Sequence, residues 1–307
     1  MNYLNNLTII IPTYNRKKYV LRAMRYWSGK GPTVLVLDGS DQPINSNDLK
    51  FMESNILYKH FPNGKDSTER IKYAVNFVHT EYAMLHADDE LFLPSGLIDC
   101  IKEIEKEDLI CCLGRCLEIN YKDNKLVTIP WTPLHASFEN YSLLDEHPEE
   151  RVFKHMLPYL CSTIYGVTKT DFWKNNWIFM KGITSFDAIE IAYEIISAFQ
   201  GRSKVINTLS WLRSNENPAH YNTGKKMLMT HEWWLNKYKY KKEQLEFVDK
   251  IVNRLIEINP DKNIYDLKAL INNAMHVYSK SADITFMMQD LINALIRSND
   301  PQMITDA

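Results

Sequence analysis

Three acidic residues end an apolar run within the first hundred residues of the chain. The segment Met84-Leu85-His86-Ala87 is followed at once by Asp88, Asp89 and Glu90. Mg²⁺ and Mn²⁺ prefer oxygen ligands, and Mg²⁺ often shares its shell between one or two carboxylates and substrate phosphates. An isolated acidic pair more often caps the following helix and stays in solvent. The choice between a cation site and a helix cap therefore rests on the other polar segments of the chain.

Two further polar segments follow apolar runs in the same way. Thr13-Tyr14-Asn15-Arg16 comes after residues 7–11 and Pro12, and Asp38-Gly39-Ser40 comes after residues 34–37. Short apolar runs rich in β-branched residues indicate buried parallel strands. In open α/β sheets, ligands bind beyond the carboxyl ends of such strands. We therefore expect these segments and the acidic cluster to face one crevice.

The elements that position these segments alternate between strands and helices. Apolar runs predict strands at residues 7–11, 34–37, 56–60 and 82–85. Apolar stripes at helical spacing predict helices at 17–28, 67–77 and 97–106, with Ser67 as an N-cap and Gly29 at the end of the first helix. This alternation predicts an α/β fold with a Rossmann-like, mostly parallel sheet flanked by helices.

The remainder of the chain predicts a second half of the sheet and then a helical region. Strands are expected at 109–114, 127–129, 162–167, 205–206 and 209–212, a helix at 185–199, and an acceptor-side loop region at 131–160. From residue 226 onward, apolar residues recur at helical spacing. We expect a domain at 1–225, with a nucleotide-binding half at about 1–107 and an acceptor half at about 108–225. A C-terminal helical subdomain at 226–307 packs on it or forms a homodimer contact.

Composition excludes several classes of protein. The 307 residues carry a net charge of −2, which provides no global field to recruit nucleic acid. No stretch of 18 apolar residues predicts a membrane span, and the N-terminal residues do not form a signal peptide. The five cysteines form no CxxC pair, so we expect reduced thiols in a cytoplasmic protein.

Taken in order, the motifs resemble those of family 2-like glycosyltransferases with the GT-A fold. The resemblance covers roughly residues 7 to 220. Its parts are the opening Ile9-Ile10-Ile11-Pro12-Thr13-Tyr14-Asn15-Arg16, the acidic Asp38-Gly39-Ser40, the Ala-x-Asn pair Ala74 and Asn76, the DxD-like Leu85-His86-Ala87-Asp88-Asp89-Glu90, the catalytic Phe186-Asp187, and the later strand ending Trp211-Leu212-Arg213.

The resemblance implies transfer of a sugar from a nucleotide-sugar donor to a glycan or lipid-linked acceptor, with inversion, as in polysaccharide biosynthesis. It places Asp38 against the nucleotide base and the opening loop against the nucleoside. Asp88 becomes a ligand of Mn²⁺ or Mg²⁺, with Asp89 as a second ligand or an orienting group. The donor-binding residues that it implies are Pro12, Thr13, Tyr14, Arg16, Asp38, Ala87 and Asp88.

Two of these residues also have simpler interpretations. Tyr14 either stacks on the base or packs in the core at the strand end. Arg16 either meets a phosphate or is a surface cation at the start of a helix. The sequence leaves both pairs of alternatives open.

Asp187 falls where the family places its general base. An inverting transferase needs a carboxylate that removes the proton of the acceptor hydroxyl as its oxygen attacks the anomeric carbon. Asp187 also begins a predicted helix, so its alternative role is that of an N-cap. Glu190, one turn later, is a reserve candidate for the base.

Three positions bear on how the motif works. His86 stands where the family has the first aspartate of DxD, and imidazole suits Mn²⁺ better than Mg²⁺. His86 has the alternative of bonding the ribose or a phosphate. Phe186 stands where an acid usually precedes the catalytic aspartate. His220 offers a late ligand for the metal or the diphosphate, or is a solvated loop residue.

Two outlying segments also carry candidate roles. Trp131, His135 and the acidic run at 145–150 either line an acceptor pocket or form an exposed loop. The basic, aromatic segment at 225–254 either lies peripherally on an anionic membrane or docks its aromatic residues on the sheet domain, which we favour.

Two other functions compete with the transferase. A non-catalytic relative that binds a carbohydrate or nucleotide would explain His86 and Phe186. A nucleotidyltransferase would need a glycine-rich phosphate loop after the first strand, and residues 13–16 contain no glycine.

Overall fold

A single ten-stranded sheet runs through the described part of the chain, in the order β3-β2-β1-β4-β9-β6-β10-β5, with β7 on β6 and β8 on β10. The computed structural model describes residues 3–62, 66–122, 125–130, 141–157, 159, 162–180, 183, 186–214, 234–235 and 239–298. The strands are β1 (Leu7–Thr13), β2 (Thr33–Asp38), β3 (Ile56–His60), β4 (Tyr82–Leu85), β5 (Leu91–Phe92), β6 (Cys111–Lys122), β7 (Lys125–Pro130), β8 (Ser142–Leu143), β9 (Val167–Lys169) and β10 (Ser203–Ser214).

The N-terminal half of the sheet is parallel, as the alternation of elements predicts. In register, Ile9 of β1 lies between Val34 of β2 and Met84 of β4, and β3 continues the parallel pairing on β2. Beyond β4 the sheet is mixed. Strand β9 is antiparallel to both β4 and β6, whereas β6 and β10 are parallel to each other. "Mostly parallel" thus describes the nucleotide-binding half, and the sheet as a whole is mixed.

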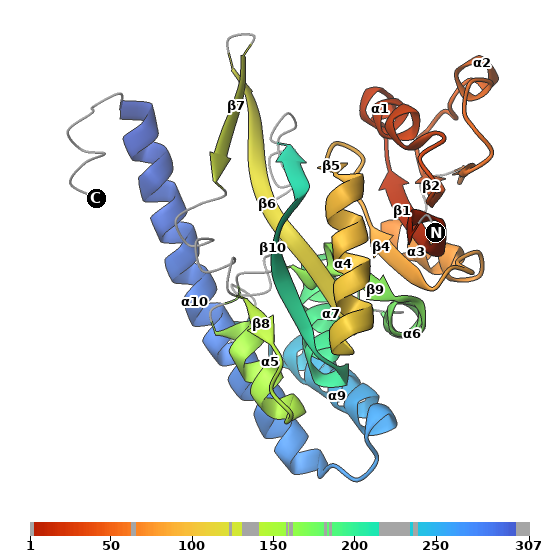
Figure 1. The fold of residues 1–307 in the computed structure, drawn as a ribbon. Coiled ribbons are helices and arrows are strands. Elements are labelled where there is room, and N and C mark those ends of the chain that lie inside the picture. Colours follow the sequence, from red (N-terminus) through yellow and green to blue (C-terminus); the bar gives the residue numbers. More distant parts are fainter. Residues whose placement is uncertain are drawn as a thin grey trace.

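Alternation along the strands gives two large cores, one on each face of the sheet, and a third, small cluster holds Ile110, Cys111, Leu113 and Val205. Ile9 and Ile11 pack with helices α1 and α4, whereas Ile10 packs on the opposite face with α3, α6 and α7. The sheet therefore has helices on both faces (Figure 1). The described helices of the first 214 residues are α1 (Lys17–Trp27), α2 (Ser46–Leu49), α3 (Ser67–Val75), α4 (Pro94–Glu107), α5 (Pro148–Met156), α6 (Thr170–Phe179) and α7 (Phe186–Gln200), with short 3₁₀ turns at Tyr3–Asn6 and Thr163–Tyr165.

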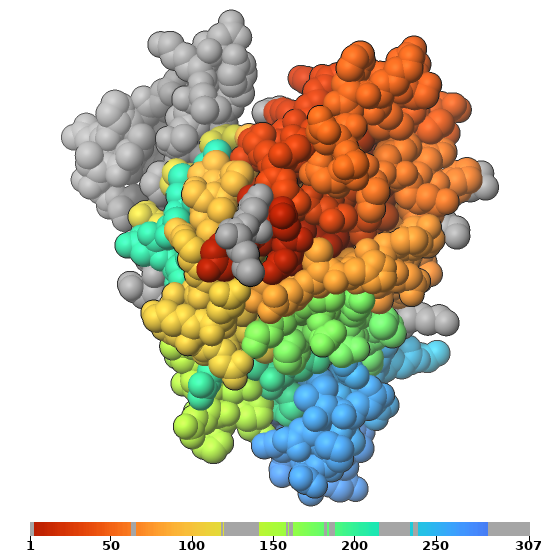
Figure 2. Space-filling model, turned by 45° about the vertical axis from the view of Figure 1, so that its right-hand side comes forward, coloured from red at the N-terminus to blue at the C-terminus, as the bar shows by residue number. Residues whose placement is uncertain are grey.

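Two long helices follow and pack against α7 and α5. Helix α9 (Lys241–Ile258) buries Ile251 and Leu255, and helix α10 (Ile264–Ser298) buries Ile271 and Met275 in the same core as α7. Figure 2 shows α9 and the first turns of α10 in blue at the lower end, away from the N-terminal residues in red and orange. In the described part of the segment at 225–254, Trp234 and the apolar face of α9 are covered by protein, whereas Trp233 and Tyr238 lie outside the described residues.

Several predicted elements have different bounds. Residues 131–160 were expected to form loops, but they contain α5, whose start carries a proline and two glutamates, which is a helix-start signal. Helix α6 was not predicted, although Trp173 and Trp177 lie four residues apart on its buried side. The strand expected at 162–167 is a 3₁₀ turn followed by β9. The two strands expected at 205–212 are one irregular strand, β10.

Helix ends and cysteines follow simple rules. Helix α1 is followed by Gly29 at φ 73°, a left-handed conformation that glycine adopts freely. The N-cap of α3 is Asp66, so the predicted cap at Ser67 is one residue late. The cysteines at positions 100, 111, 112 and 116 are free thiols, and Cys161 lies outside the described residues. Among the described helices, none is long and apolar enough to cross a membrane.

Candidate active site

Three strand ends meet at one edge of the sheet and bring the polar segments together. Thr13 at the end of β1 is the register partner of Asp38 at the end of β2. The His86 N–H, just after β4, donates to the carbonyl oxygen of Ile10 at 2.9 Å. The segments at 13–16, 38–40 and 86–89 therefore lie together at one edge of the sheet, as the order of elements predicts.

Asp88 is buried where these three strand ends meet. It is 2% exposed, and the Thr13 hydroxyl donates to its Oδ2 at 2.5 Å. Nη1 of Arg16 lies 2.8 Å from its Oδ1. Burial raises the pKa of Asp88 to about 6, while Arg16 and the Thr13 hydrogen bond oppose that rise. The charge of Asp88 thus depends on the loop that follows β1.

Asp89 binds the same arginine. Nη2 of Arg16 donates to Asp89 Oδ2. Arg22, on α1, donates to the Asp89 carbonyl oxygen at 2.8 Å. The Arg16 side chain is only 24% exposed. It is therefore a bridging cation between two acids, and the interpretation of Arg16 as a surface cation is wrong.

Asp38 is held by two donors. The backbone N–H of Ser40 donates to Oδ1 at 2.8 Å, and the Tyr58 hydroxyl donates to Oδ2 at 2.6 Å. Burial raises the pKa of Tyr58, and its hydrogen bond to Asp38 adds to the rise, so the phenol remains a donor. Asp38 is 1% exposed at the strand end, in a fixed orientation. Tyr58, on β3, was not identified from the sequence.

The loop after β1 is fastened to the loop after β2. Asn15 has φ 54°, and its N–H donates to Ser40 Oγ at 2.8 Å, while its side-chain amide donates to Asp41 Oδ2 at 2.9 Å. Tyr14 is 45% exposed between these anchors, which excludes the interpretation of Tyr14 as a core residue. Pro12 and Ala87, the other predicted donor-site residues, are half-buried at the ends of β1 and β4.

Arg70 links the ends of β1 and β2 by hydrogen bonds, and it was not identified from the sequence. It is 4% exposed on α3, and its Nη1 donates to the carbonyl oxygen of Thr13 at 2.6 Å and to that of Leu37. Burial lowers the pKa of Arg70, but the carboxylates of Asp38, Asp66 and Asp88 raise it. The available signal was its position on the apolar stripe of α3, four residues before Ala74.

Glu90 faces away from Arg16, toward β10. Trp211 donates its indole N–H to Oε2 of Glu90 at 2.7 Å, and Nε of Arg213 lies 3.9 Å from Oε1. Burial raises the pKa of Glu90 to about 7, against the opposing effects of Arg213 and Trp211. The sequence indicated Glu90 only as a third acid. The pairing depends on β10, which is more than a hundred residues away.

His86 is enclosed in protein. It is 0% exposed, and its ring lies 4.9 Å from that of Phe92, centroid to centroid. Nδ1 donates to the Ala87 carbonyl oxygen at 2.6 Å, and Nε2 accepts from the Trp27 indole N–H at 3.3 Å. Burial lowers the pKa of His86 to about 4. Both ring nitrogens are therefore engaged, which leaves neither to ligate a metal, the ribose or a phosphate.

The residues expected to act on the acceptor are described only in part. Phe186 and Asp187 begin α7, but their side chains lie outside the described ones. Glu190 accepts hydrogen bonds from the Tyr159 hydroxyl at 2.7 Å and from Ser162 Oγ at 2.9 Å. His220, Trp131 and His135 lie outside the described residues.

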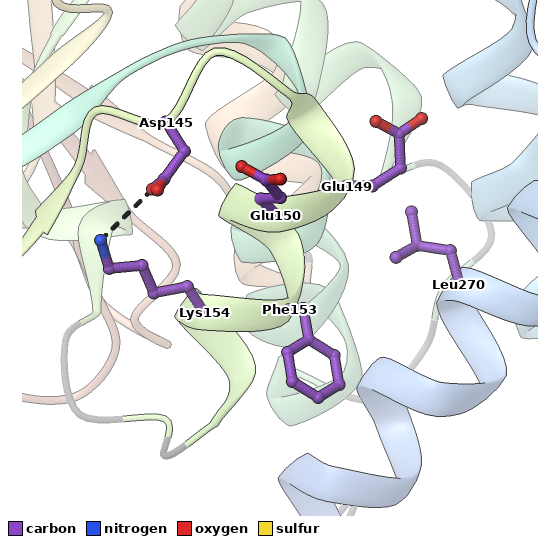
Figure 3. Close-up of a pocket in the computed structure, with 6 residues that line it drawn as sticks. All are labelled: Asp145, Glu149, Glu150, Phe153, Lys154 and Leu270. Carbon is purple, nitrogen blue, oxygen red and sulfur yellow. Dashed lines mark hydrogen bonds and ion pairs between the residues drawn. The ribbon is translucent and has the colours of Figure 1, made fainter.

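The acidic run at 145–150 lies elsewhere. Asp145, Glu149 and Glu150 line a groove of about 490 Å³ between α5 and α10, together with Phe153, Lys154 and Leu270 (Figure 3). In Figure 1, α5 and the start of α10 are at the lower end of the molecule, and β1 points toward the upper end. The structure therefore does not bring this run to the acidic cluster.

The donor atoms at the cluster suit a hard divalent cation that also binds phosphates. Asp88 and Asp89 supply carboxylate oxygens, and the buried Oδ1 of Asp88 accepts no hydrogen bond of good geometry. Within the described ranges, no three histidine, cysteine or acidic side chains converge as a complete cage. Two carboxylates with a diphosphate completing the shell fit this arrangement.

Comparison with known proteins agrees with the geometry. Residues 8–158 match the model of Glycosyl transferase family 2. The structure aligns with S. aureus TarS 1–349 at a TM-score of 0.51 and 13% identity, over 92% of this chain and 91% of that one. At that identity the likeness concerns the fold.

Two further alignments are weaker and add nothing to the fold assignment. S. aureus TarS aligns at a TM-score of 0.49 and 14% identity, over 89% of this chain and 54% of that one. TarS 1–349 in complex with UDP-GlcNAc also aligns at 0.49, with 12% identity, over 92% and 91%. No curated protein sequence matches the chain significantly. From these comparisons, residues 8–158 belong to Glycosyl transferase family 2, and the sheet with its flanking helices has the GT-A fold.

Proposed function

We propose that the chain transfers a sugar from a nucleotide-sugar donor to a hydroxyl of a glycan or lipid-linked acceptor, with inversion at the anomeric carbon. The supporting observation is the junction of three strand ends at Asp88, where Thr13 and Arg16 both contact its carboxylate. Asp38 lies at the neighbouring strand end, in register with Thr13. This edge of the sheet thus offers Asp38 to contact the nucleobase, and Asp88 and Asp89 to hold the cation that binds the diphosphate.

The donor's nucleoside belongs, in this proposal, beside Asp38 and the loop after β1. Asp38 accepts hydrogen bonds and is fixed by Tyr58 and Ser40, so it suits a base that presents an N–H donor. Tyr14, exposed beside it, stacks on the base. Pro12, Thr13 and Ala87 line the path from the base to the phosphates.

The diphosphate belongs at Asp88 and Asp89. These carboxylates would hold Mg²⁺ or Mn²⁺, with His220 as a further ligand, and the metal would stabilise the charge that the leaving nucleoside diphosphate gains. Arg16 adds a planar guanidinium, whose forked N–H groups match phosphate oxygens.

Asp187 is the proposed general base. It begins α7, the helix that also carries Glu190, and its carboxylate takes the proton of the acceptor hydroxyl. Glu190 serves less well, because its Oε1 already accepts from Tyr159 and Ser162.

The first experiment is a screen for donor hydrolysis. Uridine, guanosine, cytidine and thymidine diphosphate sugars are incubated with the protein and Mn²⁺, and the released nucleoside diphosphate is measured. We expect slow release from one nucleotide class. No release from any class, together with no nucleotide binding by calorimetry, would reject the proposal.

The second experiment tests the base with the donor found in the screen. Asp187→Asn should keep the fold and the donor affinity but lose transfer by several orders of magnitude, because the amide cannot accept the proton. Glu190→Gln is the matched control and should lose far less. Near-normal transfer by Asp187→Asn would reject Asp187 as the base.

A further inference from the structure

One guanidinium holds both acids of the proposed diphosphate site. Nη1 of Arg16 lies 2.8 Å from Asp88 Oδ1, and Nη2 donates to Asp89 Oδ2. The side chains of Asp88 and Asp89 are 1% and 11% exposed. Buried carboxylates require a partner, and Arg16 supplies one positive charge directly between the two acids, while Arg22 donates to the Asp89 carbonyl oxygen.

The two contacts differ in kind. The contact with Asp89 is a hydrogen bond, whereas Oδ1 of Asp88 accepts no well-aligned hydrogen bond despite its closeness to Nη1. Oδ2 of Asp88 is taken by the Thr13 hydroxyl. A divalent cation would therefore bind Oδ1 of Asp88, the oxygen that Nη1 of Arg16 now approaches.

Arg16 can leave while its loop stays in place. The loop backbone is fixed by the bonds from Asn15 to Ser40 and Asp41. Arg16 itself is the N-cap of α1 and makes no side-chain capping bond. Its Cζ lies 5.5 Å from the centre of the Tyr19 ring, a cation–π contact that the ring also makes with Lys18 and Arg22.

We propose that Arg16 occupies the cation position at Asp88 and Asp89 in the donor-free protein, and that its guanidinium transfers to the diphosphate when donor and divalent cation bind together. This inference rests on the proposed function. Arg16 then competes with the metal and cooperates with the phosphates. A substitution that removes the guanidinium should therefore raise the affinity for the metal and lower the affinity for the phosphates.

The test measures each ligand separately. Mn²⁺ binding is measured by the loss of the free-ion electron paramagnetic resonance signal, without phosphate ligands. Inorganic pyrophosphate binding is measured by calorimetry at saturating Mn²⁺, the condition in which the proposal places Arg16 on the phosphates. Relative to wild type, Arg16→Gln should bind Mn²⁺ about tenfold tighter, because the guanidinium no longer competes for the two carboxylates. It should bind pyrophosphate about tenfold weaker, because the phosphates lose a charged, two-pronged donor.

Two further variants make the result specific. Lys17→Gln removes an adjacent positive charge that pairs with Asp48 at 2.9 Å, and it should leave both affinities within about twofold. Arg16→Lys keeps the charge but cannot span both acids, so its Mn²⁺ affinity should lie between wild type and Arg16→Gln. This variant carries the test if Arg16→Gln fails to fold.

The outcomes separate this inference from the function on which it rests. Arg16→Gln or Arg16→Lys with unchanged Mn²⁺ affinity, or with both affinities lowered, rejects the displacement of Arg16. If the wild type still binds a nucleoside diphosphate with Mn²⁺, the glycosyltransferase site survives that result. A wild type that binds no nucleoside diphosphate with Mn²⁺ rejects both.

Discussion

The indole N–H of Trp27 donates to Nε2 of His86 across 3.3 Å. This bond fixes the tautomer, because an Nε2 that accepts must carry its proton on Nδ1, and Nδ1 donates to the Ala87 carbonyl oxygen. With its pKa lowered to about 4 by burial, His86 is neutral at neutral pH. The residue that opens the acidic motif is therefore part of the core, and of the motif's side chains it is Asp88 and Asp89 that contact Arg16.

Replacing His86 by aspartate should destabilise the protein without creating a metal ligand. The new carboxylate would lie in the pocket of Trp27 and Phe92 and face the Ala87 carbonyl oxygen. A buried charge with one donor costs about 3–5 kcal/mol. We expect a melting temperature lower by many degrees and no gain in Mn²⁺ affinity. His86→Asn is the neutral control and should cost less. Tighter Mn²⁺ binding by His86→Asp would show that position 86 reaches the crevice.

Tyr58→Phe should weaken nucleotide binding while sparing phosphate binding. The substitution removes the 2.6 Å hydrogen bond that orients Asp38. We expect roughly a tenfold loss of nucleoside diphosphate affinity by calorimetry, because the Asp38 carboxylate is no longer held in one orientation before the ligand binds. Pyrophosphate affinity should not change, because Asp38 lies at the base end of the site.

Tyr26→Phe is the matched control for this substitution. Tyr26 also donates a hydrogen bond from its hydroxyl, at 2.9 Å to the Phe92 carbonyl oxygen, but it does not contact Asp38. Equal losses of nucleotide affinity in both variants would mean that general loosening explains the effect. Equal losses of nucleotide and pyrophosphate affinity in Tyr58→Phe would place Asp38 outside the base site.

Glu90→Gln should become stabilising as the pH rises. Burial raises the pKa of Glu90 from its ordinary value of 4.5 to about 7. The folded protein therefore holds this proton more tightly than the unfolded chain, and stability is lost as the pH rises from about 4.5 to about 7. The shift corresponds to at most about 3 kcal/mol. Glutamine escapes this loss and still accepts from the Trp211 indole at its amide oxygen.

The measurement is the difference in melting temperature between Glu90→Gln and wild type across pH 5 to 8. We expect this difference to move in favour of the variant by several degrees and to level off above pH 7. The comparison cancels other groups that titrate in both proteins. A difference that stays constant with pH would mean that Glu90 is ionised in the folded protein throughout this range.

The sequence predicted the local parts of the site well. Residues 7–11, 34–37 and 82–85 are short apolar runs, and each forms a strand that delivers the predicted polar segment to one edge. Periodicity and strand-end placement are local properties, so a single sequence carries them. The same holds for α1 and for α7, whose apolar residues keep helical spacing.

The partners of these residues were not predictable, because they come from distant segments. Arg70 reaches Thr13 across 57 residues, and Glu90 meets Trp211 across 121. A buried arginine on a helix stripe looks in the sequence like an ordinary surface charge. His86 shows the same limit, since its family position indicated a ligand and only the packing of Trp27 and Phe92 reveals a core residue.

Gly39→Ala should destabilise the protein through Arg70. A Cβ at position 39 would lie 2.8 Å from Arg70 Cζ, which is closer than real Cβ contacts allow. Gly39 is not among the residues with positive φ, so backbone strain does not contribute. Arg70 can move only by giving up its bonds to the Thr13 and Leu37 carbonyl oxygens. We expect a loss of about 1–3 kcal/mol in urea unfolding.

A double-mutant cycle with Arg70→Met tests whether this loss passes through the arginine. Arg70→Met alone should be destabilising, because the Thr13 carbonyl oxygen keeps only the Gly39 N–H as a donor and the Leu37 carbonyl oxygen loses the guanidinium. In the Gly39→Ala background the same change should cost less by about 1 kcal/mol or more, because the bonds are already disturbed and the smaller side chain leaves room for the new methyl group. Additive costs would mean that alanine at position 39 acts without moving Arg70. A non-additive cycle would instead show that Arg70 sets the spacing between the ends of β1 and β2. The distance between Asp38 and Asp88 depends on that spacing.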